Sequence, residues 1–182
     1  MIKKLFVILF FLGFSFSQDK YAILENLNDD LTLLIYEEVV SMEGISKDVL
    51  FERIERYIVD GYVSSNEVVQ LNDKEKGNII VKGVGITRTD GFFGINIYVP
   101  HTLDIKVKDG RYKYLLKSST LETISDKKNT FTINELLTNT KRFTSKYGYH
   151  KWVTKADIYL QSIIPQMKEY ISNDKIAEEE DW

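Results

Sequence analysis

The sequence predicts an α+β domain: an antiparallel sheet of about four or five strands with one face covered by two helices. Three observations indicate this class. A turn signal joins two alternating segments into a hairpin, apolar residues recur at helical spacing in two other segments, and the remaining predicted strands lie together in the chain. Strands that cluster, instead of alternating with helices, favour α+β over a parallel sheet. The second face of the sheet is then left for solvent or for function.

The clearest element is a β-hairpin over residues 102–116, TLDIKVKDGRYKYLL. Apolar and charged residues alternate through its first arm, which is the period of a half-buried strand. Asp109-Gly110 predicts a two-residue type I′ turn, in which both residues have positive φ. This turn fixes the register and puts on one apolar face the pairs Leu103–Leu116, Ile105–Tyr114 and Val107–Tyr112. The opposite face carries a mostly basic set: Asp104, Lys106, Lys108, Arg111 and Lys113.

Other strands are predicted over residues 31–42, 67–71, 78–87 and 95–99. The second arm of the hairpin is expected to end at or before Ile124. Gly83 and Gly85 weaken the strand that contains them, and they indicate a bulge or a close approach of the backbone by another group. Pro100 lacks a backbone N–H and so marks an edge, a bulge or a bend.

The first predicted helix covers residues 46–59. Ser46 is expected to be its N-cap, and Gly61 is expected to follow it in the left-handed conformation. Its apolar stripe consists of Leu50, Ile54, Tyr57 and Ile58.

The second predicted helix covers residues 154–172 and begins at a capping pair formed by Thr154 and Asp157. Pro165 lies inside it and predicts a kink. Residues 131–152 give no clear pattern, apart from a helical turn near residues 134–137.

The first 17 residues are typical of a signal peptide. A basic start precedes an apolar run over residues 5–16, and a small-x-small pattern ends at Ser17, so cleavage is expected between Ser17 and Gln18. The alternative, an uncleaved anchor, needs about 20 apolar residues. The chain has no Cys, which excludes a lipoprotein signal, disulfides and thiol catalysis. The protein is therefore expected to be exported, and to be periplasmic or secreted.

The domain organisation expected after the signal peptide is simple. It comprises a lead-in segment (18–30), the strand-helix-sheet domain (31–124), a basic-aromatic loop with the C-terminal helix packed on the same domain (125–174), and an acidic tail (175–182). Removing Lys3 and Lys4 leaves 22 of the 24 basic residues against 27 acidic ones, a formal charge of −5. This balance opposes nucleic-acid binding. No transmembrane segment is expected after signal removal.

Three segments resemble a known family: residues 39–47 (VVSMEGISK), 77–83 (GNIIVKG) and 105–112 (IKVKDGRY). The family consists of exported bacterial proteins that share a domain of unknown function with a TATA-binding-protein-like fold. The resemblance covers about residues 31–124. It implies a curved antiparallel sheet backed by helices, and it brings no activity and no catalytic residues.

No catalytic constellation is evident. His101 and His150 lie in different segments and are expected to be ordinary surface or loop residues. Gly83-Val84-Gly85 is followed by Arg88, where a dinucleotide fingerprint needs glycine, and no helix follows. The carboxylate pairs have turn-like surroundings and lack the spacing of a calcium loop. Neither a metal nor a cofactor is expected.

A second candidate contact lies in residues 136–156, which contain no acidic residue. Its candidate side chains are Lys141, Arg142, Lys146, Tyr147, Lys151 and Trp152. Interleaved cations and aromatic rings suit anionic glycans, lipid headgroups or an acidic protein patch. In the alternative interpretation, the aromatic rings cover the core and the lysines are merely solvated.

The sequence therefore predicts a non-enzymatic, exported domain that acts in binding or in envelope assembly. Its partner is an unknown envelope protein or glycan, and the basic face of the hairpin is the first place to look for the contact. Two alternatives stay open: a small periplasmic enzyme with a site in the sheet concavity, and a factor that binds glycans or lipid headgroups. The oligomeric state is not predicted.

Overall fold

The computed structural model describes residues 26–62, 68–90, 94–124, 128–138 and 146–173. The strands are β1 (Leu34–Ser41), β2 (Val69–Asp73), β3 (Asn78–Arg88), β4 (Asn96–Lys108), β5 (Arg111–Ser118), β6 (Thr120–Ile124) and β7 (Lys128–Thr132). The helices are α1 (Lys47–Gly61), α3 (Ile133–Thr138) and α4 (Lys146–Ser172). The predicted signal peptide and most of the predicted lead-in and acidic tail lie outside the described residues.

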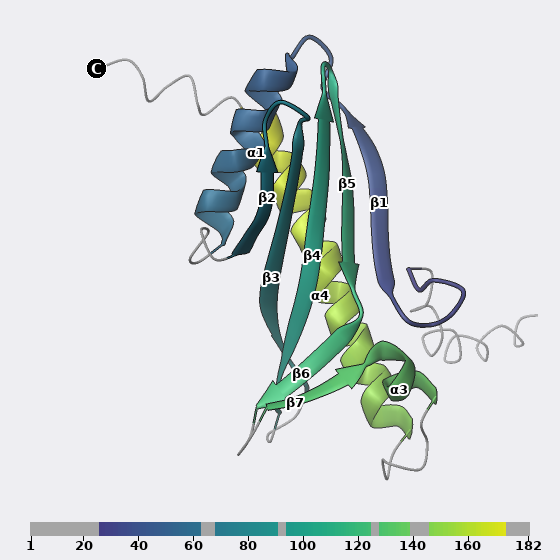
Figure 1. Cartoon of the computed structure of the whole chain (residues 1–182). Coiled ribbons are helices and arrows are strands. Elements are labelled where there is room, and N and C mark those ends of the chain that lie inside the picture. The colour runs from purple at the N-terminus through teal and green to yellow at the C-terminus, as the bar shows by residue number, and fades with distance from the viewer. Residues whose placement is uncertain (1–25, 63–67, 91–93, 125–127, 139–145, 174–182) are drawn as a thin grey trace, which may run out of the picture.

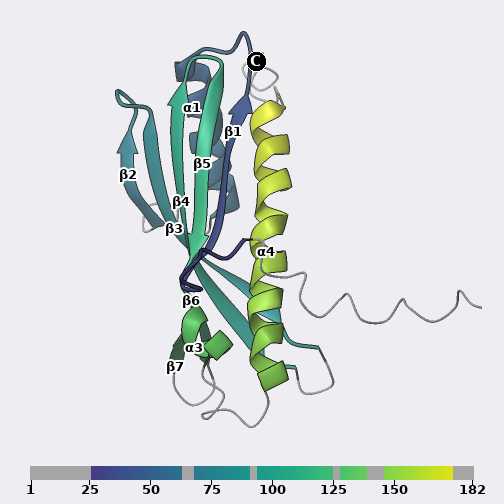
Figure 2. The same ribbon diagram turned by 90° about the vertical axis from the view of Figure 1, so that its right-hand side faces the viewer.

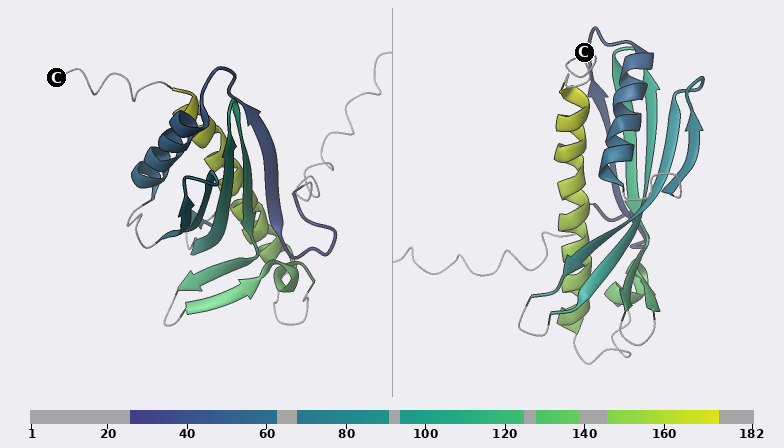
Figure 3. Two further views of the ribbon diagram at one scale, coloured as in Figure 1. Left: turned by 45° about the horizontal axis from the view of Figure 1, so that its top comes forward. Right: turned by 90° about the vertical axis from the view of Figure 1, so that its left-hand side faces the viewer.

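All paired strands are antiparallel, in the order β1-β5-β4-β3-β2, and β6 joins the sheet by pairing with β4 and β7. Both long helices lie on one face of this sheet, as the predicted fold class requires (Figures 1–3). The described sheet has seven strands, more than predicted. The second arm of the hairpin breaks at Ser119 into β5 and β6. The seventh strand, β7, forms in a segment where the sequence predicts no strand.

The hairpin forms in the predicted register. Leu103 pairs with Leu116, Ile105 with Tyr114 and Val107 with Tyr112, and all six side chains are buried under the helices. The predicted turn type is wrong, because Gly110 has φ +69° but Asp109 does not have positive φ. The turn is instead shaped by contacts with the start of α1. The Asp109 carboxylate accepts from Lys47 N–H at 2.8 Å, and Gly110 N–H donates to Ile45 O at 2.9 Å.

Helix α1 begins as predicted, with Ser46 as N-cap accepting from Val49 N–H at 3.4 Å. It buries Leu50, Ile54 and Ile58 against the sheet. The prediction for Gly61 is wrong. Gly61 is the last helical residue and has no positive φ, because the helix is closed by Tyr62 N–H donating to Ile58 O at 3.0 Å.

Helix α4 begins at Lys146, eight residues before the predicted start at Thr154. Thr154 and Asp157 do not form a cap. The Thr154 hydroxyl donates to His150 O inside the helix at 2.7 Å, and Asp157 is buried against β1. Pro165 lies within α4 and is exposed. The helical turn predicted near residues 134–137 is confirmed by α3.

Gly83 and Gly85 let aromatic rings lie directly on the inner face of β3. A Cβ atom at Gly85 would lie 1.9 Å from the Tyr159 ring, and one at Gly83 would lie 2.4 Å from the Tyr62 ring. Real Cβ atoms do not tolerate such distances, so the sequence signal for a close approach is confirmed. The two rings come from segments far apart in the sequence: Tyr62 directly follows α1, and Tyr159 lies within α4.

Candidate binding surface

The face of the sheet turned away from α1 and α4 collects cationic side chains. Cross-strand pairing puts Lys106 beside Lys113, Lys108 beside Arg111, and Thr102 between Lys82 and Lys117. We call the outward side chains of Lys82, Lys106, Lys108, Arg111, Lys113 and Lys117 the basic face. Among the described elements, no helix lies over it (Figures 1 and 2). Four of its members, Lys106, Lys108, Arg111 and Lys113, are sequence-predicted site residues, and the structure brings them together.

Most of the basic face has no internal counter-ion. Lys113 forms an ion pair with Glu37 of β1. Within the described residues, the other five cations form no ion pair and no side-chain hydrogen bond. Asp104 lies between Lys106 and Thr102 on the same side of β4. Its buried Oδ1 atom has no hydrogen-bond partner in the structure. Unpaired exposed cations keep a positive potential that attracts anionic groups, although the whole protein is acidic.

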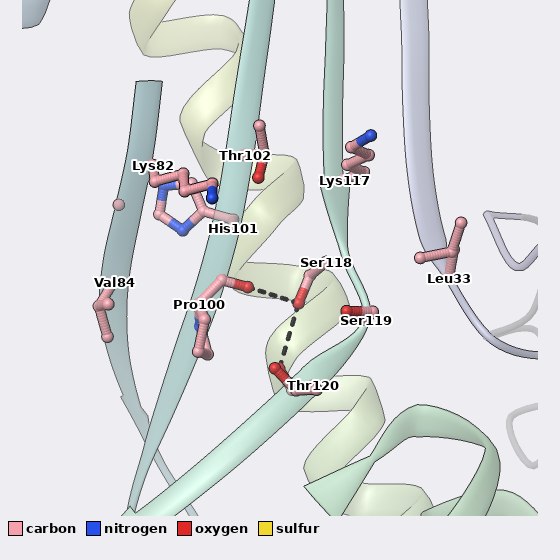
Figure 4. A pocket seen from close by; sticks show the side chains of 11 residues that line it. Leu33, Lys82, Val84, Pro100, His101, Thr102, Lys117, Ser118, Ser119 and Thr120 are labelled. Atoms are coloured by element: carbon pink, nitrogen blue, oxygen red, sulfur yellow. Dashed lines mark hydrogen bonds between the residues drawn. The ribbon is translucent and has the colours of Figure 1, made fainter. Parts of the chain in front are cut away.

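A hollow of about 470 Å³ opens at one end of this face, where β5 leaves β4 (Figure 4). Pro100 cannot donate to a neighbouring strand, so β4 loses little when β5 departs beside it. The Ser118 hydroxyl takes over by donating to Pro100 O at 2.7 Å. The walls include apolar Leu33 and Val84, and polar Thr102, Ser119 and Thr120.

Two lysines flank the hollow. Lys82 and Lys117 lie on either side of Thr102 in one cross-strand row (Figure 4). Two strand spacings separate their backbones by about 10 Å. Two lysines whose backbones are this far apart, with a hydroxyl between them, are suited to an anionic group such as a carboxylate or a phosphate.

His101 also borders the hollow, but its ring is engaged on the helix side. It is 5% exposed, so the prediction of a surface or loop histidine is wrong for this residue. Alternation along β4 places it among inward residues, where Gly83 leaves room for its ring. Nδ1 lies 3.0 Å from Val99 O, and Nε2 lies 3.3 Å from the Tyr62 hydroxyl. Burial lowers the pKa of His101, so the ring is neutral at pH 7.

These contacts leave no reactive pair in the hollow. Both nitrogens of His101 have partners, and the Ser118 hydroxyl donates to a carbonyl, so neither is positioned as a nucleophile or base. Across the described ranges, no group of three or more His, Cys, Asp or Glu residues is arranged to hold a metal ion. The chemistry this surface offers is ion pairing and hydrogen bonding.

The described residues of the second predicted contact are not part of this surface. Lys141 and Arg142 lie outside the described residues, and Lys146 and Tyr147 fall in the first turn of α4, on the other side of the sheet. Lys151 is exposed, whereas Trp152 is half-buried and packs edge-on against Phe131 with 5.8 Å between ring centroids. For Trp152, the interpretation as a core-covering side chain therefore describes its position.

Sequence reasoning missed Lys82 and Lys117 and the hydroxyl groups beside them. A signal for both lysines was available. Lys82 alternates with Val81 and Gly83, and Lys117 continues the outward series that begins at Arg111. The hollow itself had no such signal, because it arises where β5 and β4 separate in space.

These features define a class of protein: an α+β domain whose antiparallel sheet is backed by helices on one face and exposed on the other. Residues 36–121 match the family model described as "Domain of unknown function (DUF4468) with TBP-like fold". This match lies within the part of the chain that carries the resemblance, and it confirms the resemblance. No curated protein matches the chain.

Two solved structures share this fold. A TBP-like protein from Parabacteroides distasonis superposes with a TM-score of 0.63 at 17% identity, covering 81% of this chain and 96% of that one. A DUF4468 family protein from Bacteroides ovatus has the same TM-score at 12% identity, covering 86% of this chain and 96% of its own. At these identities the similarity establishes the fold alone.

Proposed function

We propose that the protein is a non-enzymatic domain that acts in binding or assembly in the cell envelope after export, and that the basic face makes the contact. The observation that carries this proposal is the helix-free sheet face with five cations that have no ion pair in the described structure, next to a hollow. The partner is an envelope protein or glycan that presents carboxylate or phosphate groups.

The proposal of export rests on the sequence of the first 17 residues, which has the basic, apolar and small-residue regions of a signal peptide. None of the described helices is long and apolar enough to span a membrane. N-terminal sequencing of the mature protein tests this part directly, because cleavage after Ser17 gives a chain that begins at Gln18.

The contact is tested by photo-crosslinking in intact cells. A photoreactive residue replaces Lys117, beside the hollow, or Lys106, in the middle of the basic face. The matched control replaces Glu52, an exposed residue of α1 on the opposite side of the molecule. Specific adducts are expected from positions 117 and 106 and not from position 52.

Charge reversal then separates contact from proximity. For this test the photoreactive residue replaces Lys82, because positions 106 and 117 carry the reversed charges. Lys106→Glu combined with Lys117→Glu is expected to remove the adducts formed from position 82. Lys74→Glu, a reversal at an exposed lysine outside the basic face, is expected to leave them unchanged. Adducts that form equally well from position 52, or that survive the double reversal, would contradict a role for this face.

A further inference from the structure

Among the described residues, the outer edge of β1 is covered only at its first two residues, Leu34 and Ile35. Ile35 N–H donates to Asn26 O at 2.8 Å, and Asn28 N–H donates to Leu33 O at 3.1 Å. Successive residues of an antiparallel strand direct their backbone groups to opposite sides. The odd-numbered residues of this strand therefore face away from β5. Consistent with this, Met42 N–H points the other way and donates to Gly110 O at 2.8 Å.

Beyond Ile35, the residues that face outward are Glu37, Val39 and Ser41. Within the described residues, the backbone groups on this side have no partner, because β1 pairs with β5 alone in the sheet and the pairing with residues 26–28 stops at Ile35. This strand has no Pro, no Lys and no bulge, three of the devices that block pairing at a natural edge, and its charged residues are Glu37 and Glu38. Figure 2 looks onto this edge, and no described helix stands in front of it.

We propose that this edge pairs with β1 of a second copy of the chain, antiparallel and centred on Val39, so that two sheets join in a twofold dimer. In this register Val39 lies opposite the partner's Val39, and Glu37 lies opposite the partner's Ser41. All three outward-facing residues are used. Since each such pair exchanges two bonds, about six backbone hydrogen bonds form.

Charge and strand length select this register over its neighbours. A dimer centred on Glu38 sets that carboxylate opposite itself, and a dimer centred on Val40 pairs only residues 39–41 of each strand, because β1 ends at Ser41. Like charges directly opposite each other destabilise a strand pair. Centring on Val39 avoids both, because Glu38 then lies opposite the partner's Val40 and residues 37–41 of each strand are paired.

Charge complementarity also favours a second copy as the occupant. Ser41 pairs with Arg111 on β5, so the row through Glu37 continues across the new interface to the partner's Ser41 and then to the partner's Arg111. The backbones of Glu37 and the partner's Arg111 are about 10 Å apart, which is two strand spacings. The small Ser41 side chain between them lets the guanidinium reach the Glu37 carboxylate, which also forms an ion pair with Lys113 of its own chain. Arg111 has no ion pair in the described structure, and the twofold axis makes this contact twice.

The absence of Cys from the chain makes the test direct. Val39→Cys puts two thiols opposite each other at a Cα separation of about 5.5 Å, which suits a disulfide. Mild oxidation of the mature protein is expected to give a covalent dimer. Val59→Cys on α1 is the matched control, since Val59 is 61% exposed and Val39 is 56% exposed. It is expected to stay monomeric on a non-reducing gel.

The register has its own test. Glu37→Cys and Ser41→Cys are expected to cross-link when mixed and not when either is oxidised alone. Light scattering of the unmodified mature protein is expected to give twice the monomer mass. Val39→Pro removes an outward N–H without touching the β5 ladder, so it is expected to abolish the dimer and to retain the fold.

Three outcomes would overturn the proposal: a monomeric mature protein, cross-linking of Val39→Cys no greater than that of Val59→Cys, or a dimer that survives Val39→Pro. The first of these outcomes, combined with cross-linking through position 39 in a chain that starts at residue 26, would identify residues 18–25 as the occupant of the edge. None of these results depends on the partner of the basic face, so the two proposals fail separately.

Discussion

The hydroxyl of Tyr36 on β1 donates a hydrogen bond to the carboxylate of Asp157 on α4, and both residues are buried. Asn26 and Gln161 donate to the same carboxylate at 3.2 Å and 3.1 Å. Burial, followed by the bond and charge of Asp157, raises the pKa of Tyr36, which keeps the phenol a donor. One buried carboxylate therefore ties together the segment before β1, β1 itself and the last helix.

Asp157→Ala is expected to lower the free energy of unfolding by about 2–3 kcal/mol, because it leaves the buried Tyr36 hydroxyl without its acceptor. Urea unfolding monitored by circular dichroism measures the change. Tyr36→Phe is expected to cost only about 1 kcal/mol, since the carboxylate keeps two other donors. Asp48→Ala, at an exposed carboxylate, is the control. Equal losses from Asp157→Ala and Asp48→Ala would contradict the role of this bond.

Gly85→Ala is expected to cost more than 2 kcal/mol, because its Cβ atom would lie 1.9 Å from the ring of Tyr159 and either the ring or the strand must move. Gly61→Ala is the matched control. Gly61 is helical, and the nearest atom to an added Cβ is 3.8 Å away, so this change is expected to stabilise by up to about 1 kcal/mol. Opposite signs in thermal unfolding are the expected result, and a loss from both substitutions would be inconsistent with it.

The stability of the protein is expected to fall with acidification below about pH 6.5, the usual pKa of histidine. Burial lowers the pKa of His101 in the folded protein, so the unfolded chain binds a proton first as the pH drops. The free energy of unfolding therefore decreases progressively as the pH falls below the usual pKa of histidine. Unfolding measured between pH 7.5 and 5.5 checks this. The His101→Gln variant is expected to lose most of the slope, and a slope that His101→Gln leaves unchanged would assign it to other groups.

Gly110→Ala is expected to destabilise by about 1 kcal/mol through backbone strain alone. Gly110 has φ +69°, and the nearest atom to an added Cβ is 4.0 Å away, so space is not the cause. Gly110→Asn is expected to cost less, because Asn adopts the left-handed region more readily. Denaturant midpoints of the two variants decide the matter. An Asn variant less stable than the Ala variant would show that packing dominates.

Several elements were predictable because their signals are local. Alternation along residues 102–116 fixed which side chains of the hairpin are buried, and the hydroxyl of Ser46 marked the start of α1. The same locality explains the errors. Asp109-Gly110 reads as a type I′ turn in isolation, but its backbone is held by Ile45 and Lys47, residues far away in sequence. Thr154 and Asp157 resemble a cap, but Asp157 is committed to Tyr36.

The candidate surface was predicted in part for the same reason. Lys106, Lys108, Arg111 and Lys113 share a face because side chains alternate along a strand, and this rule needs no tertiary structure. Lys117 continues the same alternation along β5, whereas Lys82 joins this face only through the pairing of β3 with β4. His101 was placed wrongly, because its burial depends on Tyr62 and Tyr159 packing over Gly83 and Gly85.

Periodicity and turn residues act within a few positions of each other, so the class of fold, the hairpin register and the chemical character of one sheet face follow from the amino-acid sequence alone. The folded chain adds which helices cover the sheet, where β5 leaves β4 to open the hollow, and which part of the β1 edge has no pairing partner among the described residues. Those features depend on contacts between residues far apart in the chain, and neither periodicity nor composition records which distant segments meet.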